Sequence, residues 1–335
     1  PPLNHTRCLA PRVVLVRAGV GPFVPGRGSA RAGTMETAGH PRSVEEGSTP
    51  VSETAIVVGV DGSETADHAL AWARERAGRT GAHVYAVMGW DVPPFMFSPS
   101  PMGVPVPPIE VIRDTAKRQL ADAVERAGGE AGSFTAVLRE EGPVAALLEE
   151  AKDHDADLIV VGTRGLGPVK RLLLGSVSSR VTADAPCPVA VVPDGAPVGP
   201  AGPVVVGVDG SEGSVAALRW AAAETDAPIH AIYAISYPFG PVDPVVEPEF
   251  TNHEDFGRQV VEQTVALALG DDTGRVTAAA TGGDARDVLI QVVEALDASL
   301  LVTGARGAKG LTGIGSVPTA VMAHSRVPVV VVPTS

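Results

Sequence analysis

An internal repeat is the feature that most constrains how this chain can fold. The octapeptide VVGVDGSE occupies residues 57–64 and recurs unchanged at residues 205–212. Further downstream, DLIVVGTRG at 157–165 is answered by ASLLVTGARG at 298–307, and CPVAVVP at 187–193 by VPVVVVP at 327–333. An eight-residue identity followed by matching segments rarely arises by chance, so the sequence predicts two copies of one domain. The length of 335 residues suits two domains of ordinary size.

Within each copy, apolar runs alternate with segments of helical spacing, such as Ile112, Ala116, Leu120 and Ala123. This alternation predicts parallel sheets built from right-handed βαβ units. We therefore expect an α/β fold of two tandem, doubly wound, five-stranded parallel-sheet domains with helices on both faces. The expected strands are 55–60, 82–90, 133–139, 157–162 and 188–193 in copy one, and 203–208, 228–235, 275–280, 298–304 and 327–332 in copy two.

The boundary between the copies is expected in PDGAPVGPAGP at 193–203, where Pro and Gly interrupt both periodicities and no residue is expected to anchor a core. This predicts a first domain at 54–194, a linker at 195–202 and a second domain at 203–335. Residues 1–34 hold five Arg and no acidic residue, which leaves two interpretations open: translated sequence upstream of Met35, or a basic targeting arm. Residues 35–53 are polar and aperiodic, so the whole of 1–53 is expected outside the folded domains.

Composition argues against several classes of partner. The net charge of -13 lacks the basic footprint that nucleic acid or an anionic membrane requires. No apolar run approaches the roughly 20 residues of a spanning helix. The two cysteines, Cys8 and Cys187, form no CxxC or Cys/His cluster, so neither a disulfide framework nor a zinc site is expected. We expect a cytoplasmic protein with no nucleic-acid partner, no membrane partner and no metal site of its own.

Asp61 and Gly62 follow the first expected strand, at the sheet edge where doubly wound folds bind ligands. A carboxylate at this position can meet the polar edge of a base. Alternatively, Asp61 and Ser63 cap the helix that is expected to begin near Thr65. The spacing leaves both interpretations open.

A second candidate follows the fourth strand, where Gly162 and Gly165 precede Gly175-Ser176 at the start of a helix. Glycines let backbone N–H groups approach an anion, and a helix N-terminus adds its dipole, so a phosphate chain fits there. Ser176 and Ser178 can add hydroxyl donors. Nearby charge comes from three basic residues, which can equally be solvated loop residues: Arg164, Lys170 and Arg171.

Taken together, residues 54–333 resemble tandem universal stress proteins. Their ATP-binding signature reads Gly, two residues, Gly, nine residues, Gly, then Ser or Thr, and copy one matches it in full. The resemblance implies that the loop holds the triphosphate and ribose of ATP with Mg, that Asp61 contacts adenine, and that Val87 and Met88 line the base pocket. The candidate nucleotide-binding residues of copy one are Asp61, Gly62, Val87, Met88, Gly162, Arg164, Gly165, Gly175, Ser176, Val177 and Ser178.

Copy two departs from the signature. Gly304 and Gly307 are followed after seven residues, not nine, by Gly315-Ser316. Pro318 stands where copy one has Ser178, and proline removes a backbone donor from the start of the helix. Asp209 is the counterpart of Asp61. Whether copy two binds nucleotide is therefore left open. Its five candidate residues are Asp209, Gly304, Gly307, Gly315 and Ser316.

The resemblance implies a nucleotide-dependent stress-response regulator rather than an enzyme. A slow ATPase or phosphotransferase is the alternative, although no GxxxxGK[ST] loop is present. A third reading is an interaction protein that does not depend on nucleotide. In the family the last strands commonly build dimers, so the valine-rich runs 188–193 and 327–332 predict a homodimer or an internal pseudo-dimer of the two copies. The Pro-rich connections 91–108 and 237–249 are expected to form mobile rims above the ligand edge.

Overall fold

The computed structural model describes residues 16–17, 54–91, 108–128, 134–165, 174–199, 202–235, 251–307 and 313–334. The remainder of 1–53, Lys170, Arg171 and nearly all of both Pro-rich connections lie outside the described residues, so the expectations for them stay predictions. In the described part of the chain, no helix has the length and apolarity that crossing a membrane requires.

The first copy forms a five-stranded parallel sheet in the order β6-β5-β2-β3-β4, as expected for a doubly wound domain. Each expected strand is present within two residues of its expected bounds. The elements are β2 (Ala55–Gly59), α1 (Glu64–Thr80), β3 (His83–Gly89), α2 (Ile109–Arg126), β4 (Phe134–Arg139), α3 (Pro143–Asp153), β5 (Leu158–Gly162), α4 (Ser176–Asp184) and β6 (Val189–Val192).

The second copy repeats this order as β9-β8-β7-β10-β11, again with parallel neighbours. A two-residue strand, β1 (Val16–Arg17), adds antiparallel to the outer edge of β9. The remaining elements are β7 (Val204–Gly207), α5 (Glu212–Glu224), β8 (Ile229–Ile235), α6 (Thr251–Leu269), β9 (Val276–Gly282), α7 (Ala285–Ala295), β10 (Leu300–Gly304), α8 (Ser316–His324) and β11 (Val329–Val332).

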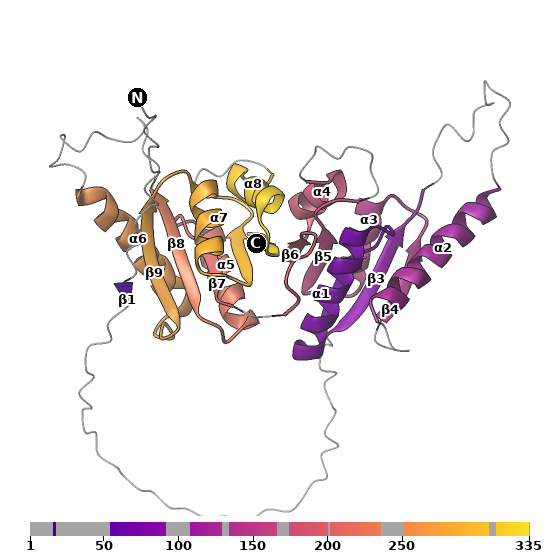
Figure 1. Cartoon of the computed structure of the whole chain (residues 1–335), viewed down its shortest axis with the longest axis horizontal. Coiled ribbons are helices and arrows are strands. Elements are labelled where there is room, and N and C mark those ends of the chain that lie inside the picture. Colours follow the sequence, from indigo (N-terminus) through magenta and orange to yellow (C-terminus); the bar gives the residue numbers. More distant parts are fainter. Residues whose placement is uncertain are drawn as a thin grey trace, which may run out of the picture.

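The two last strands join the copies into one continuous sheet (Figure 1). Strand β6 pairs antiparallel with β11, with Ala190 opposite Val330. Each strand therefore has a neighbour on both sides, and neither lies at a sheet edge. The valine-rich final runs pair within the chain, which is one of the two arrangements that the sequence predicted.

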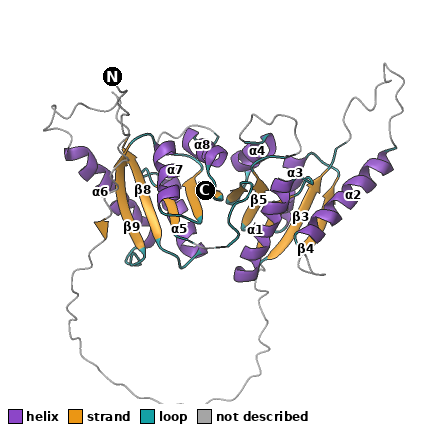
Figure 2. Ribbon diagram, viewed as in Figure 1, coloured by secondary structure: helices purple, strands orange, loops and turns teal. Residues whose placement is uncertain are grey.

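Helices cover both faces of this sheet (Figure 2). Side chains alternate between faces along each strand, which produces two apolar layers. One layer lies between the sheet and α1, α2, α5 and α6, and holds Ile56, Leu70 and Leu218. The other lies beneath α3, α4, α7 and α8, and holds Ile159, Leu289 and Met322. Valine and alanine dominate both layers, and aromatic residues make up only 4% of the sequence.

The connection between the domains is better anchored than the sequence indicated. Its Pro and Gly content predicted that no residue would enter a core, yet Ala196 is 8% exposed and belongs to the layer beneath α1 and α5. Composition identified the connection but not this contact, because burial of an alanine depends on neighbours far away in sequence.

Candidate functional site

The candidate site is a cavity of about 800 Å³ at the carboxyl ends of β2, β3 and β5. The chain leaves β2 for β3 on one side and later returns to place β5 on the other, so this edge is the point where strand order reverses. Residues from the ends of those strands and from the starts of α1, α3 and α4 line the cavity. Those named as candidates from the sequence are Asp61, Gly62, Val87, Gly162, Arg164, Gly165, Gly175, Ser176, Val177 and Ser178.

Asp61 lies on the wall of this cavity and orients the start of α1. Its Oδ1 accepts hydrogen bonds from the backbone N–H of Ser63 at 3.0 Å and from the Ser63 hydroxyl at 2.6 Å. Ser63 in turn caps α1, because its Oγ accepts from the N–H of Ala66 at 3.2 Å. The capping interpretation therefore holds for Ser63, with α1 beginning at Glu64, while Asp61 combines contact with the cap and a place on the cavity wall.

The first two glycines of the loop permit close approaches that a side chain would block. A Cβ added at Gly162 would lie 2.9 Å from Cβ of Thr65, at the start of α1. A Cβ added at Gly165 would overlap Oδ2 of Asp61. The glycine spacing thus brings the loop after β5 against the loop after β2, on two sides of one cavity.

The third glycine closes the loop and opens α4. Its N–H donates to the carbonyl of Thr163 at 2.7 Å, which joins the two ends of the loop. The first helical bond of α4 comes from the N–H of Ser179 to the carbonyl of Gly175 at 3.0 Å. The N–H groups of the first turn, residues 176–178, precede that bond, and no side chain caps them. Such groups attract anions.

The side chain of Ser178 makes a structural contact of its own, in addition to the backbone N–H that this residue presents at the start of α4. Its hydroxyl donates to the carbonyl of Gly162 at 2.6 Å, and its side chain is buried. The hydroxyl thereby ties the start of α4 to the end of β5. Thr65 makes a similar tie, because its hydroxyl donates to the carbonyl of Arg164.

The charged residues on the cavity wall have both signs. Arg164 is half exposed and lies 3.4 Å from Oδ2 of Asp194, which follows β6. Glu64, at the first position of α1, also contributes to the wall. The sequence did not single out Asp194, Glu64 or Thr65 for this site. Asp194 lies two residues after the end of β6, the last strand of the domain and a neighbour of β5, and this position was the available signal.

The sequence expectation for Met88 differs from the structure. The sequence expectation placed Val87 and Met88 together on the base pocket, but only Val87 lines the cavity. Consecutive side chains of a strand point to opposite faces. Met88 accordingly belongs to the apolar layer under α1 and α2, whereas Val87 belongs to the layer under α3 and α4.

Copy two reproduces much of this geometry despite its shorter loop. Oδ1 of Asp209 accepts from the N–H and hydroxyl of Ser211, as Asp61 does from Ser63. A Cβ at Gly307 would meet Oδ2 of Asp209, and one at Gly304 would meet the backbone of Gly213. The N–H of Gly315 donates to the carbonyl of Ala305 at 2.9 Å, so the shorter loop closes through the same backbone bond.

The start of α8 is where the copies differ. Gly315 precedes Ser316 as Gly175 precedes Ser176, but Pro318 occupies the third position of α8. Proline has neither the N–H of Ser178 nor its hydroxyl. The first turn of α8 therefore offers one backbone donor fewer than the first turn of α4.

Comparisons with known proteins agree with the two-copy fold. A model of the universal stress protein family matches residues 54–193 and, again, residues 201–333. A universal stress protein of Mycobacterium tuberculosis is 32% identical over 310 residues, covering 85% of this chain and 98% of that protein. A solved universal stress protein from Archaeoglobus fulgidus has a similar fold, with a TM-score of 0.61 and 21% identity over 84% of this chain and 96% of its own. A universal stress protein solved in complex with cAMP is 26% identical and covers 43% of this chain and 98% of its own, with a TM-score of 0.32.

Proposed function

Because the chain belongs to the universal stress protein family, we propose that the cavity of its first domain binds ATP and that nucleotide occupancy regulates a stress response. The observation that carries this proposal is the convergence of three features on one cavity: the Asp61 carboxylate, the Gly162–Gly165 turn and the first turn of α4. A cavity of about 800 Å³ lies within the range of small-ligand sites.

The two ends of the cavity suit the two ends of a nucleotide. The first turn of α4 points backbone N–H groups at the loop, and Arg164 adds a cation nearby, so this end suits phosphates. Val87 supplies an apolar wall and Asp61 a hydrogen-bond acceptor at the end of β2, so that end suits a base with an exocyclic amine. Adenine has such an amine.

Magnesium fits as a companion of the phosphates. The described residues contain no cluster of three or more His, Cys, Asp or Glu side chains that would hold a metal ion alone. Mg²⁺ often binds through one or two carboxylates together with substrate phosphates, and Glu64 and Asp194 contribute carboxylates to this wall in addition to Asp61, which we assign to the base. When bound, Mg²⁺ would offset the phosphate charge beside those carboxylates.

We propose a binding module rather than an enzyme. The described residues on the cavity wall include no His, Cys or Lys that would activate a nucleophile. Of the acidic side chains, Asp61 accepts a hydrogen bond from Ser63, and Asp194 pairs with Arg164. Regulation then requires two states of the protein that differ in their affinity for ATP, because a ligand that binds both equally shifts nothing.

We propose weaker binding by copy two. The retained Asp209 contact and the bond from Gly315 to Ala305 keep the frame of a site. Pro318 removes one donor from the helix start, and a hydrogen bond to a charged group contributes about 1.5–3 kcal/mol. A loss of that size lowers affinity by roughly tenfold or more.

The test is nucleotide released from purified protein, together with calorimetric titration of Mg-ATP. The variants are Gly165→Ala/Gly175→Ala in copy one and the matched pair Gly307→Ala/Gly315→Ala in copy two. We expect one tight site per chain, abolished by the first pair and kept by the second. Wild-type protein that neither carries nucleotide nor binds Mg-ATP at millimolar concentration would overturn the proposal and favour an interaction protein independent of nucleotide.

A further inference from the structure

The two domains face each other across an approximate twofold axis, and the repeat identifies which residues are counterparts. CPVAVVP and VPVVVVP align Ala190 with Val330. These same two residues are opposite each other in the antiparallel pairing of β6 with β11. A residue that faces its own counterpart lies on the axis relating two copies. The axis therefore passes between Ala190 and Val330.

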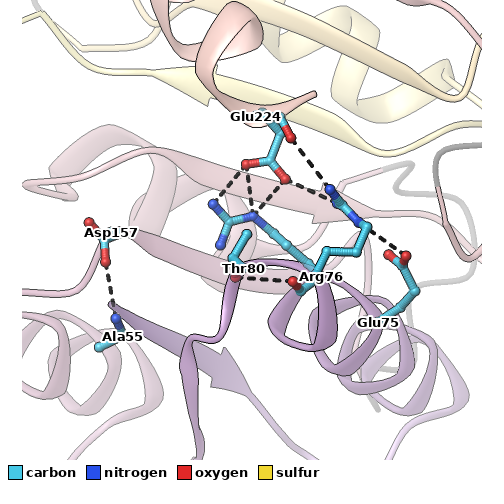
Figure 3. A network of polar contacts seen from close by, with 7 residues as sticks. Ala55, Glu75, Arg76, Thr80, Asp157 and Glu224 are labelled. Atoms are coloured by element: carbon cyan, nitrogen blue, oxygen red, sulfur yellow. Dashed lines mark hydrogen bonds and ion pairs between the residues drawn. The ribbon is translucent and has the colours of Figure 1, made fainter. Parts of the chain in front are cut away.

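A buried ion pair joins a second set of counterparts on one side of the sheet (Figure 3). Arg76 in α1 and Glu224 in α5 are 148 residues apart, which is also the offset between the two VVGVDGSE segments. Nε and Nη2 of Arg76 donate to the Glu224 carboxylate at 2.8–3.0 Å. Their side chains are 8% and 5% exposed. Arg79, held by Glu75, adds a contact to Glu224 at 3.2 Å.

A third set of counterparts meets on the other side of the sheet. Thr182 in α4 and Met322 in α8 are 140 residues apart, the same separation as Ala190 and Val330. The Thr182 hydroxyl lies 3.8 Å from Sδ of Met322, and both residues are buried. Contacts between counterparts thus run through the whole thickness of the interface.

At each of these positions the copies carry different residues that complement each other. Arg76 meets Glu224, and the smaller Ala190 and Thr182 meet the larger Val330 and Met322. If two first domains paired in this way, Arg would face Arg; if two second domains did, Glu would face Glu. Like charges buried at one point cannot be compensated by each other, and the smaller residues would leave space unfilled.

We propose that this interface is built to accept only the unlike copy, so that the first domain pairs with the second domain of its own chain and like copies are rejected. An axis position in a symmetric dimer places a residue against itself, so opposite charges can meet there only when the copies differ. Repulsion against the wrong partner is a recognised source of specificity. A buried ion pair contributes little net stability compared with apolar residues, which leaves discrimination as its main effect.

One consequence concerns association between chains. The short connection at 193–203 keeps the second domain at high effective concentration beside the first. Strands β6 and β11 are already paired within the chain. Two chains whose domains are paired in this way can associate only through a surface other than the valine-rich strands.

The test exchanges the two charges in the full-length chain. The variants are Arg76→Glu, Glu224→Arg and the double swap, each in a Cys8→Ser/Cys187→Ala background. Energy transfer between dyes attached through Val111→Cys and Leu267→Cys, two exposed positions, measures the separation of the domains. We expect each single reversal to broaden the distance distribution and to lower the thermal midpoint by roughly 5–10 °C. The double swap should restore the distance and part of the midpoint, since Arg79 still faces position 224.

A matched control uses the ion pair of Asp67 with Arg126, which joins α1 to α2 inside one domain at 2.7 Å and is partly exposed. Reversing Asp67 should leave the inter-domain distance unchanged, because exposed pairs contribute little and this one does not cross the interface. The proposal is overturned if the double swap remains as open and as unstable as the worse single variant, or if the single reversals keep the wild-type distance and midpoint. The test still decides if a single variant loses its helical circular-dichroism signal, because the proposal then requires the double swap to recover that signal.

Discussion

Asp61 and Gly165 form the contact on which the candidate site depends at the scale of single residues. The carboxylate is held on one side by the N–H and hydroxyl of Ser63. On the other side it lies so close to Cα of Gly165 that no side chain fits between them. A neighbour from another loop is therefore sufficient to explain the second glycine of the signature.

We predict that Gly165→Ala weakens binding of Mg-ATP by roughly tenfold or more, because the new methyl group must displace the Asp61 carboxylate and a hydrogen bond to a charged group is lost. Isothermal titration calorimetry measures the change. Gly307→Ala is the matched control, since it displaces Asp209 in the other domain. Equal affinities for wild type and Gly165→Ala would contradict the assignment of Asp61 to the base.

Cys187 allows a prediction about pH. Burial, followed by the nearby Asp157 charge, raises the pKa of its thiol to about 12. Its pKa in the unfolded chain is about 8.5. Since the native state keeps the proton, the stability that this group contributes is complete below about pH 8.5 and is lost as the pH rises toward 12.

The native thiol should accordingly resist labelling by a disulfide reagent at pH 8 and react only on unfolding. Cys8→Ser removes the other cysteine, and Cys187→Ala provides the blank. In chemical denaturation, Cys187→Ala should show a smaller loss of stability between pH 8 and pH 10 than the chain that keeps Cys187. Rapid labelling of the folded protein would show that the thiol is not buried as described.

At the scale of elements, α4 and α8 have the same length and the same glycine cap but differ at their third residue. The N–H and hydroxyl of Ser178 have no equivalent in Pro318. The backbone bond that closes each loop is present in both copies, so loop length matters less for the frame than the signature suggested. The donors of the first helical turn are the larger difference.

Ser178→Pro should therefore give copy one the weaker binding that we propose for copy two. Ser178→Ala separates the causes, because it keeps the N–H and loses only the hydroxyl bond to Gly162. We expect the proline variant to bind Mg-ATP at least several-fold less tightly than the alanine variant. Parallel titrations decide this, and indistinguishable affinities would remove the N–H of residue 178 from the site.

At the scale of the whole molecule, the antiparallel pairing of β6 with β11 turns two domains into one sheet. The apolar layers of both domains continue across it, with Ala190 and Val330 in the same layer. The two halves should therefore unfold together.

Val330→Arg tests this cooperativity, because it places an unpaired charge at a fully buried position of the shared sheet. We expect the second domain to unfold at a lower temperature than the first, so that calorimetry shows two transitions in place of one. Ala136→Arg, at an exposed position of the edge strand β4, is the control and should keep the single transition. A single, merely lowered transition for Val330→Arg would indicate that the halves remain coupled by other contacts.

The sequence by itself determined the number of copies, the positions of the strands in each and the glycine positions of the candidate site. These follow from local patterns, namely an exact repeat, alternating apolar periods and the spacing of glycines. The strand bounds were accurate because Val-rich runs between Gly and Pro have few alternatives.

Only the tertiary structure decided which face each side chain takes and which distant residues meet. Met88 was misplaced because strand periodicity distinguishes the two faces but does not say which one borders the cavity. The tie from Thr65 to Arg164 and the pair of Arg76 with Glu224 join residues about 100 positions apart or more. Contacts of that kind are set by packing between elements, which no local pattern records.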